Sequence, residues 1–281
     1  MSGAAKFMIF SSFAFSLMHL CVKALPHIPV FELVFFRSIC SLFISYIYLK
    51  KEKKAVFGKN KKLLLARGIF GTIGLTLFFI TLQKLPLAGA VTIQYLSPIF
   101  TAIFAVFFLK EKVKPRQWFF FGLAFSGVFL LKGFDISGQI SQLFFFIGIL
   151  SALFSGLAYS TIRFLRRTED QLVVVFYFPL VATPVMGLMS FFNWVQPQGL
   201  DWLYLVLMGV IAQLAQVYMT KGIQSDLAGN TMTYKYVGVL FAFIYGFFFF
   251  EETYSFLSVF GILLLILGVI LNSLFKNKDG D

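Results

Sequence analysis

The chain has 281 residues, of which 59% are hydrophobic, 40 are Phe and only 13% are charged. Such a composition excludes a water-soluble globular domain and predicts an integral membrane protein. The formal net charge of +12 does not require a nucleic-acid partner, because Lys and Arg in short turns beside an anionic membrane leaflet account for it.

Ten apolar runs follow one another along the chain, and a helix needs about 20 such residues to cross the hydrocarbon core of a bilayer. Only the fifth run is marginal in length. Closed β-barrels would show short alternating segments instead, so the runs predict an all-α integral membrane protein with ten transmembrane helices. In chain order the runs are residues 5–24, 30–49, 63–82, 86–109, 115–132, 141–164, 171–192, 202–222, 228–250 and 254–275.

Lys and Arg are distributed unequally between the alternate connections of these runs. With the N-terminus inside, nineteen of them, Arg67 included, would lie on the cytoplasmic side, and three would lie outside: Lys23, Lys84 and Lys132. Positive residues concentrate on the cytoplasmic side of membrane proteins. We therefore expect both termini to be cytoplasmic.

Two stretches of thirty residues, 83–112 and 224–253, are versions of each other at a constant offset of 141. A duplication is therefore predicted, with residues 1–135 as the first five-helix repeat and residues 136–281 as the second. Because five is odd, the second repeat must enter the membrane in the opposite sense. Secondary transporters use such inverted repeats to open one site to alternate sides. Matching pairs at this offset include Gln83 and Gln224, Thr92 and Thr233, Tyr95 and Tyr236, Phe100 and Phe241, and Glu111 and Glu252.

Several predicted helices carry small or polar residues on one face. Close helix packing explains the small residues, but amide, imidazole and ammonium groups are costly in lipid unless they face water or the bundle interior. A central polar cavity is therefore predicted, with the helices of residues 115–132 and 254–275 peripheral to it. The lining helices would be those of residues 5–24, 63–82, 86–109, 141–164, 202–222 and 228–250. The candidate solute contacts are His19, Arg37, Gln94, Tyr95, Tyr159, Gln213, Gln216, Lys235 and Tyr236.

Lys235 lies seven residues inside a predicted helix, about 10 Å from its end at 1.5 Å per residue. If it faces the cavity, it is a fixed cation suited to a carboxylate or phosphate on the solute, with Gln94, Tyr95 and Tyr236 as hydrogen-bonding neighbours. Alternatively, its long stem extends to the cytoplasmic surface. Both interpretations stay open at this point.

Arg37 is a second cation inside a predicted helix. Glu32 is five residues away, a rotation of about 140°, so the two do not share a face. Arg37 is expected to be a structural anchor or part of an outward gate, and Glu32 to be hydrated near the outer interface. His19 could couple transport to protons, or it is a hydrogen-bonded packing residue. Glu111 and Glu252 are expected to cap the helices that follow them.

No motif of a soluble enzyme is present. The sequence has no Gly-rich phosphate loop, no His-Glu-x-x-His pattern and no cysteine cluster. We therefore expect no catalytic residue, no metal site and no cofactor. Transport would then draw on a solute or ion gradient.

Short motifs connect the chain to a known family. The stretch FELVFFRS at 31–38, LPLA at 85–88 and LSP at 96–98, with Glu111 before a helix that contains Gly122 and Gly127, resemble the EamA-type transporters of the drug/metabolite transporter superfamily. The resemblance covers the whole chain and implies a carrier of small metabolites in the plasma membrane, which in bacteria is the inner membrane. Two positions of the second half depart from the pattern: Val239 replaces the helix proline, and Lys235 stands where the first half has Gln94.

The buried cations indicate the kind of solute. Arg37 and Lys235 lack a buried acid of comparable depth, so a negative group on the solute would be stabilised between them. We expect a secondary transporter that moves an amino acid, a related zwitterion or a small organic anion by alternating access. The partners would be that solute and the lipid bilayer, with the protein a monomer or a homodimer. The alternatives are a lipid-handling flippase and a non-transporting membrane scaffold.

Overall fold

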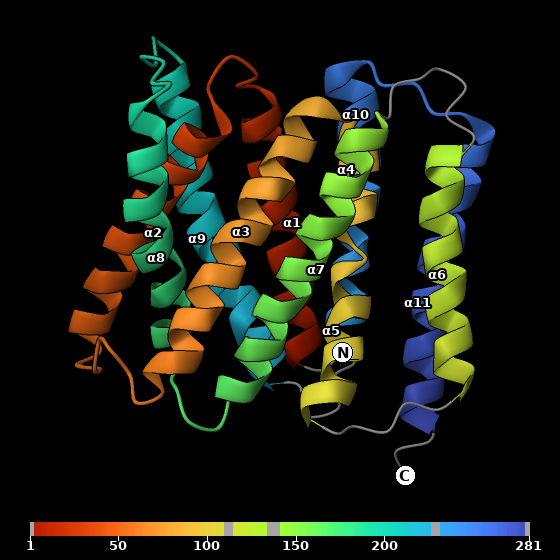
Figure 1. Ribbon diagram of the computed structural model, residues 1–281, viewed down its shortest axis with the longest axis horizontal. Helices are drawn as coiled ribbons and strands as arrows, with labels where there is room; N and C mark the ends of the chain where they lie inside the picture. Colours follow the sequence, from red (N-terminus) through yellow and green to blue (C-terminus); the bar gives the residue numbers. More distant parts are fainter. Residues whose placement is uncertain (1–2, 110–114, 134–140, 226–230, 279–281) are drawn as a thin grey trace.

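The computed structural model describes residues 3–109, 115–133, 141–225 and 231–278, and these residues form a bundle of helices without strands (Figure 1). Most helices run side by side along one direction, as expected for a chain in a bilayer. The helices are α1 (Gly3–Lys23), α2 (Val30–Lys51), α3 (Lys61–Lys84), α4 (Leu87–Gln94), α5 (Ser97–Leu109), α6 (Pro115–Gly133), α7 (Gln142–Leu165), α8 (Gln171–Phe191), α9 (Asp201–Ser225), the 3-10 helix η1 (Thr231–Tyr236), α10 (Val237–Phe250) and α11 (Phe256–Lys278).

The helices confirm the prediction of an all-α membrane protein. Among the described residues, seven helical segments have the length and hydropathy of membrane spans. They are α1, α2, α3, α7, α8, α9 and the α4–α5 pair over Leu87–Phe108. Three shorter apolar helical segments, Trp118–Leu130, Tyr234–Phe250 and Phe256–Gly268, belong to the remaining runs.

Two of the expected helices are broken near the middle of the bundle. Residues 86–109 were predicted as one helix, but α4 ends at Gln94 and α5 begins at Ser97. Pro98 explains this break, because it has no N–H to donate to the carbonyl of Gln94 and its ring crowds that carbonyl. In the second half, η1 takes the equivalent place before α10, although Val239 stands where the first half has Pro98.

The two breaks meet through a pair of equivalent tyrosines. The hydroxyl of Tyr236 donates to the carbonyl oxygen of Tyr95 at 2.7 Å, and the two rings lie 5.3 Å apart. The break leaves the Tyr95 carbonyl without its usual helical partner, since Ile99 and Phe100 both donate to Leu96 instead. The Tyr236 hydroxyl therefore satisfies an acceptor that the broken helix exposes.

Removing that hydroxyl is expected to destabilise the centre of the bundle. Tyr236→Phe leaves the buried Tyr95 carbonyl unsatisfied, which costs about 1–3 kcal/mol of unfolding free energy. Thermal unfolding of the detergent-solubilised protein measures the change. Tyr234→Phe is the matched control, because Tyr234 belongs to the same 3-10 helix and is exposed. Equal melting temperatures for the two variants would contradict this role of Tyr236.

Contacts between the halves recur at the offset of 141. A Cβ atom at Gly68 of α3 would lie 2.5 Å from Cγ2 of Val181 in α8. At the equivalent Gly209 of α9, a Cβ atom would lie 2.5 Å from Cβ of Cys40 in α2, and Cys40 is the equivalent of Val181. Small residues at both positions let the helix backbones approach closely. The α3–α8 contact thus has its counterpart in the α9–α2 contact.

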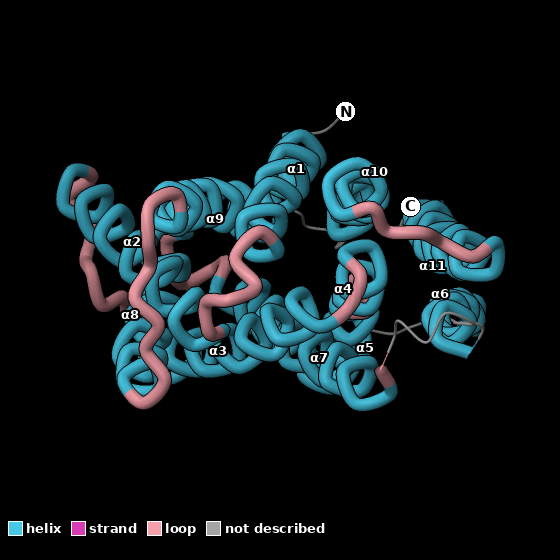
Figure 2. The backbone as a smooth tube through the Cα atoms, turned by 90° about the horizontal axis from the view of Figure 1, so that it is seen from above, coloured by secondary structure: helices cyan, strands magenta, loops and turns pink. Residues whose placement is uncertain are grey.

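Figure 2 shows the arrangement seen from above. The helices α6 and α11 pack against each other at one end of the molecule, while α1, α3, α4, α7 and α9 surround its middle. The larger apolar core lies in this middle region and includes Leu25, Phe79, Leu82 and Tyr95. Helices of both halves therefore surround the middle of the molecule.

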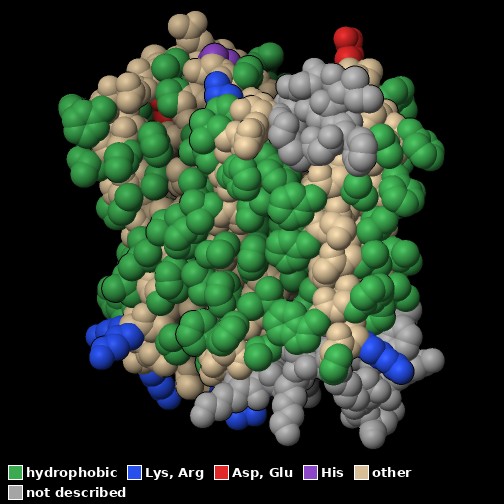
Figure 3. Space-filling model, turned by 45° about the vertical axis from the view of Figure 1, so that its right-hand side comes forward, with side chains coloured by type: hydrophobic (Ala, Val, Ile, Leu, Met, Phe, Trp, Pro, Cys, Tyr) green, Lys and Arg blue, Asp and Glu red, His purple; other side chains and the backbone are tan. Residues whose placement is uncertain are grey.

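The surface divides into an apolar belt and charged ends. In Figure 3, hydrophobic side chains cover the middle of the visible face, and most of the visible Lys and Arg lie at its lower end. At that same end α1 begins and α11 ends (Figure 1). The apolar belt is the part that suits a hydrocarbon environment.

Glu252 does not cap the helix that follows it, so that expectation is wrong. Its Oε1 accepts from the backbone N–H of Leu87 at 2.6 Å, at the start of α4, and lies 3.4 Å from Nζ of Lys23. The start of α11 is capped by Ser255, whose Oγ accepts from the N–H of Ser258 at 3.1 Å. Burial and the Glu252 carboxylate raise the pKa of Tyr254, whose hydroxyl donates to Oε2 of Glu252 at 2.8 Å.

One further expectation has a clear outcome in the fold. Glu32 is buried and does not lie exposed at the interface, and its Oε2 accepts from the N–H of Val195 at 3.0 Å. Glu32 thus ties the start of α2 to the segment between α8 and α9. Glu111 lies outside the described residues.

Candidate functional site

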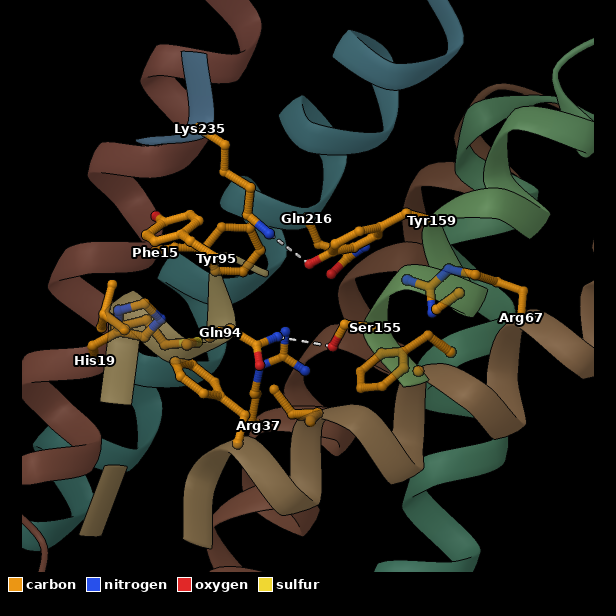
Figure 4. A pocket seen from close by; sticks show the side chains of 17 residues that line it. Phe15, His19, Arg37, Arg67, Gln94, Tyr95, Ser155, Tyr159, Gln216 and Lys235 are labelled. Atoms are coloured by element: carbon orange, nitrogen blue, oxygen red, sulfur yellow. Dashed lines mark hydrogen bonds between the residues drawn. The ribbon is translucent and has the colours of Figure 1, made fainter. Parts of the chain in front are cut away.

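A cavity lies at the centre of the bundle, between α1, α2, α3, α4, α7, α8, α9 and η1 (Figure 4). Its volume is about 70 Å³. Ligand pockets usually measure about 300–1,000 Å³, so in this conformation the cavity is too small for a drug-sized solute. The lining residues are Phe15, Met18, His19, Arg37, Arg67, Gly71, Leu75, Phe78, Val91, Gln94, Tyr95, Ser155, Ala158, Tyr159, Phe178, Gln216 and Lys235.

Lys235 extends from η1 into this cavity, and its side chain does not run to the surface. The residue is 6% exposed, and its ammonium group donates to the hydroxyl of Tyr159 at 2.7 Å. The same nitrogen lies 4.3 Å from the ring centre of Tyr159 and 5.5 Å from that of Tyr95. No ion pair of Lys235 exists among the described residues. The ammonium is therefore held by a phenol and two aromatic faces, which leave its full charge uncompensated.

Gln94 ends α4 at the edge of the cavity and is held by two serines of α7. Its amide nitrogen donates to Oγ of Ser155 at 2.8 Å, and its carbonyl oxygen accepts from Oγ of Ser151 at 2.7 Å. A Gln side chain has two N–H groups and two lone pairs, so one of each stays available. Gln94 is thus a fixed donor and acceptor in the cavity that Lys235 also lines.

Arg67 is a cavity residue that the sequence analysis placed in the cytoplasm, and that assignment is wrong. It lies inside α3, which begins at Lys61, and it is 2% exposed. Its position four residues inside the run of residues 63–82 was the signal that could have identified it. Arg67 and Arg37 approach the same aromatic ring, with their guanidinium carbons 5.4 Å and 5.0 Å from the ring centre of Phe178.

His19 and Gln216 complete the polar part of the lining. The imidazole of His19 lies between two rings, 6.4 Å from that of Phe15 and 5.1 Å from that of Phe78. Its Nδ1 and the amide nitrogen of Gln216 are buried and have no hydrogen-bond partner within the part of the chain that the structure describes. Both groups are available to a solute or to water.

Two of the candidate residues do not reach the cavity. Gln213 donates to Oγ of Ser45 at 2.7 Å and so joins α9 to α2. Gln213 and Gln216 are three positions apart on α9, so their side chains differ in direction by about 60°. Tyr236 is buried behind the lining, where it holds the carbonyl of Tyr95.

The helices predicted to line the cavity all contribute to it, and α6 and α11 contribute no lining residue among those described. Two further helices also take part: α2 supplies Arg37 and α8 supplies Phe178. The aromatic and aliphatic lining residues, such as Phe78 and Phe178, were not predicted. Their residue types are the same as those facing lipid, so composition gave no signal for them.

Comparison with known protein families gives two matches along this chain. The model of the EamA-like transporter family matches residues 3–133 and, a second time, residues 142–274. Together these matches cover most of the 281 residues.

Several relatives are transporters by name. The chain is 30% identical over 276 residues to the pseudopaline exporter CntI of Pseudomonas aeruginosa, covering 97% of this chain and 95% of that protein. It is 30% identical to solute carrier family 35 member G1 of Mus musculus, covering 92% of this chain and 74% of that protein. The S-adenosylmethionine uptake transporter of Rickettsia felis is 25% identical, with 79% and 75% covered.

A solved crystal structure has the same fold. It superimposes with a TM-score of 0.75 over 100% of this chain and 99% of the other, at 18% sequence identity. At that identity the likeness concerns the fold alone.

Proposed function

This chain belongs to the EamA-like transporter family, and we propose that it moves a small organic acid, an amino acid or a related zwitterion by alternating access. It is a multi-pass membrane protein that transports small molecules, as are its relatives named as exporters and uptake transporters. The class of solute and the transport cycle are the proposal.

The main observation behind the proposal is the ammonium group of Lys235. It lies in the cavity, bonded to a neutral phenol, and the described lining residues include Arg37 and Arg67 but no acidic side chain. A buried charge without a counter-charge is costly. A carboxylate on the solute supplies that counter-charge and adds a charge-assisted hydrogen bond.

The residues that line the cavity favour a solute in which that carboxylate belongs to an organic molecule. Amide, hydroxyl and aromatic groups line the same cavity, with Gln94, Tyr95, Tyr159 and Phe15 among them. These groups suit a molecule with both polar and apolar parts better than a bare inorganic ion. An amino acid or a small organic acid fits this combination.

The duplication supports alternating access. We propose ten membrane-spanning helices, with residues 1–135 and 136–281 as two five-helix halves of opposite orientation. The equivalent contacts of Gly68 and Gly209, and the meeting of Tyr95 with Tyr236, are what such halves predict. Because the cavity is smaller than a typical ligand pocket, the helices must separate before a solute enters.

The charge distribution supports a cytoplasmic location of both termini. Most of the Lys and Arg visible in Figure 3 lie at the end where α1 begins and α11 ends. Basic residues concentrate on the cytoplasmic side. With bacterial relatives such as the Pseudomonas aeruginosa exporter, we place the protein in the inner membrane of a bacterium.

Solute exchange in proteoliposomes tests the proposal. Vesicles containing the purified protein are loaded with unlabelled amino acids or organic acids, and the uptake of labelled glutamate, lysine, succinate and choline is measured against protein-free vesicles. Protein-dependent uptake of an acid or zwitterion, with none of choline, is the expected result. Uptake of choline alone, or flipping of a fluorescent phospholipid without solute uptake, would overturn the assignment.

A further inference from the structure

We propose that the transported solute carries a second carboxylate and that Arg37 and Arg67, called here the arginine pair, bind it. This rests on the proposed function, in which Lys235 binds the first acidic group. It defines the solute more narrowly, as a dicarboxylic organic acid or an amino acid with an acidic side chain.

The arginine pair is a buried part of the cavity wall. Arg37 comes from α2 and Arg67 from α3, each is 2% exposed, and both guanidinium groups lie next to the ring of Phe178. Two like charges beside one ring repel each other in a medium of low dielectric constant. An anion between or beside them removes that repulsion.

Hydrogen bonding at the arginine pair is incomplete. In both residues Nε and one terminal nitrogen are buried and have no partner among the residues that the structure describes. A guanidinium group presents its N–H donors in a planar fork that matches the two oxygens of a carboxylate. If the two arginines were only structural anchors, these N–H groups would donate to helix carbonyls. The lack of such partners therefore indicates a ligand.

The second half of the repeat shows that helix packing alone does not require arginine at these two positions. The equivalents of Arg37 and Arg67 at the offset of 141 are Phe178 and Met208, which are also buried in the core of the bundle. The scaffold therefore packs well with apolar side chains at both positions. The two charges belong to the first half alone, as expected for residues that serve an asymmetric solute.

Lys235 and the two residues of the arginine pair enter one cavity from different directions. Figure 4 shows Lys235 and Arg37 entering from opposite sides, with Gln94 between them, while Arg67 approaches from a third direction. Tyr159 holds the ammonium of Lys235, whereas Phe178 adjoins the arginine pair. A solute with two acidic groups can bind the ammonium of Lys235 with one and the arginine pair with the other.

Matched pairs of probes test the second carboxylate. Glutamate and glutamine differ only in an acidic group against its amide, as do succinate and succinamate. Binding of each probe to the detergent-solubilised full-length protein is measured by thermal stabilisation and by competition. We expect at least one diacid to bind at least about tenfold more tightly than its monoamide. Arg67→Met should reduce this preference to about one, because it weakens the binding of the diacid more than that of the monoamide.

Controls separate this proposal from folding defects and from the proposed function. Arg167→Met removes an exposed arginine and should leave the preference intact, and Arg67→Gln replaces Arg67→Met if the latter does not fold. Lys235→Gln should weaken both members of a pair. If monoacids bind and no diacid is preferred, the arginine-pair assignment fails and the proposed function stands; if no organic acid binds, both fail. A preference for a phosphomonoester over every diacid would also overturn the carboxylate assignment.

Discussion

Lys235→Gln is expected to reduce the uptake of organic acids and zwitterions by about 10- to 100-fold. A hydrogen bond to a charged group is worth about 1.5–3 kcal/mol, and each 1.4 kcal/mol corresponds to about a factor of ten. Gln is the residue at the equivalent position of the first half, Gln94, so the repeat already accommodates it. The measurement is the initial uptake rate in proteoliposomes at solute concentrations well below saturation, with equal amounts of reconstituted protein.

Lys221→Gln is the matched control for this loss. Lys221 lies near the end of α9, beside the ring of Tyr218, and is not among the cavity residues. The control removes the same charge without changing the cavity, so its uptake should equal that of the parent. If Lys235→Gln transported acids as fast as the parent does, Lys235 would not be the counter-charge and the assigned class of solute would be wrong.

The sequence predicts most of the fold because the bilayer imposes strong constraints. A membrane segment needs a long apolar run with internally paired backbone groups, and such runs are visible without any structure. The apolar run from 86 to 109 continues through the break between Gln94 and Ser97, but a proline inside such a run predicts a kink or break. Pro98 was its local signal. The partner of the freed Tyr95 carbonyl could not be predicted, because Tyr236 lies 141 residues away.

The site was predictable where the lining is polar and not where it is apolar. His19, Gln94 and Lys235 drew attention because polar groups inside apolar runs are costly, and all three line the cavity. Phe178 lines it too, but nothing in the sequence distinguishes it from the other 39 Phe residues. Arg67 was assigned to the cytoplasmic side, because it lies near the start of its run.

The cap at Glu252 shows a second limit of sequence reasoning. A carboxylate just before a helix is usually interpreted as the cap of that helix. Here the carboxylate reaches the start of α4, where it accepts from Leu87 and pairs with Lys23 of α1. Which of two nearby helix starts receives the carboxylate depends on tertiary packing, so the sequence shows that a cap is present but not which helix it serves.

Gly127→Leu is expected to separate α6 from α11 and to lower the free energy of unfolding by about 3 kcal/mol, the upper part of the range for overpacking. A Cβ atom at Gly127 would meet the carbonyl oxygen of Gly261 and lie 2.8 Å from the backbone nitrogen of Leu265. Backbone atoms cannot rotate away as a side chain can, so the helices must move apart. In a bilayer, close packing is what holds such helices together. Thermal unfolding in detergent measures the loss.

Gly268→Leu should have the same effect, because the contact repeats at the offset of 141. A Cβ atom at Gly268 would lie 2.8 Å from the carbonyl oxygen of Phe120, which is the equivalent of Gly261. Gly122→Leu is the control within α6, since a Cβ atom there has no neighbour within 4 Å among the described atoms. Its stability should stay within about 0.5 kcal/mol of the parent. A loss at Gly127 without one at Gly268 would show that the two halves do not pack equivalently, and the inverted duplication proposed for the transport cycle would lose its structural basis.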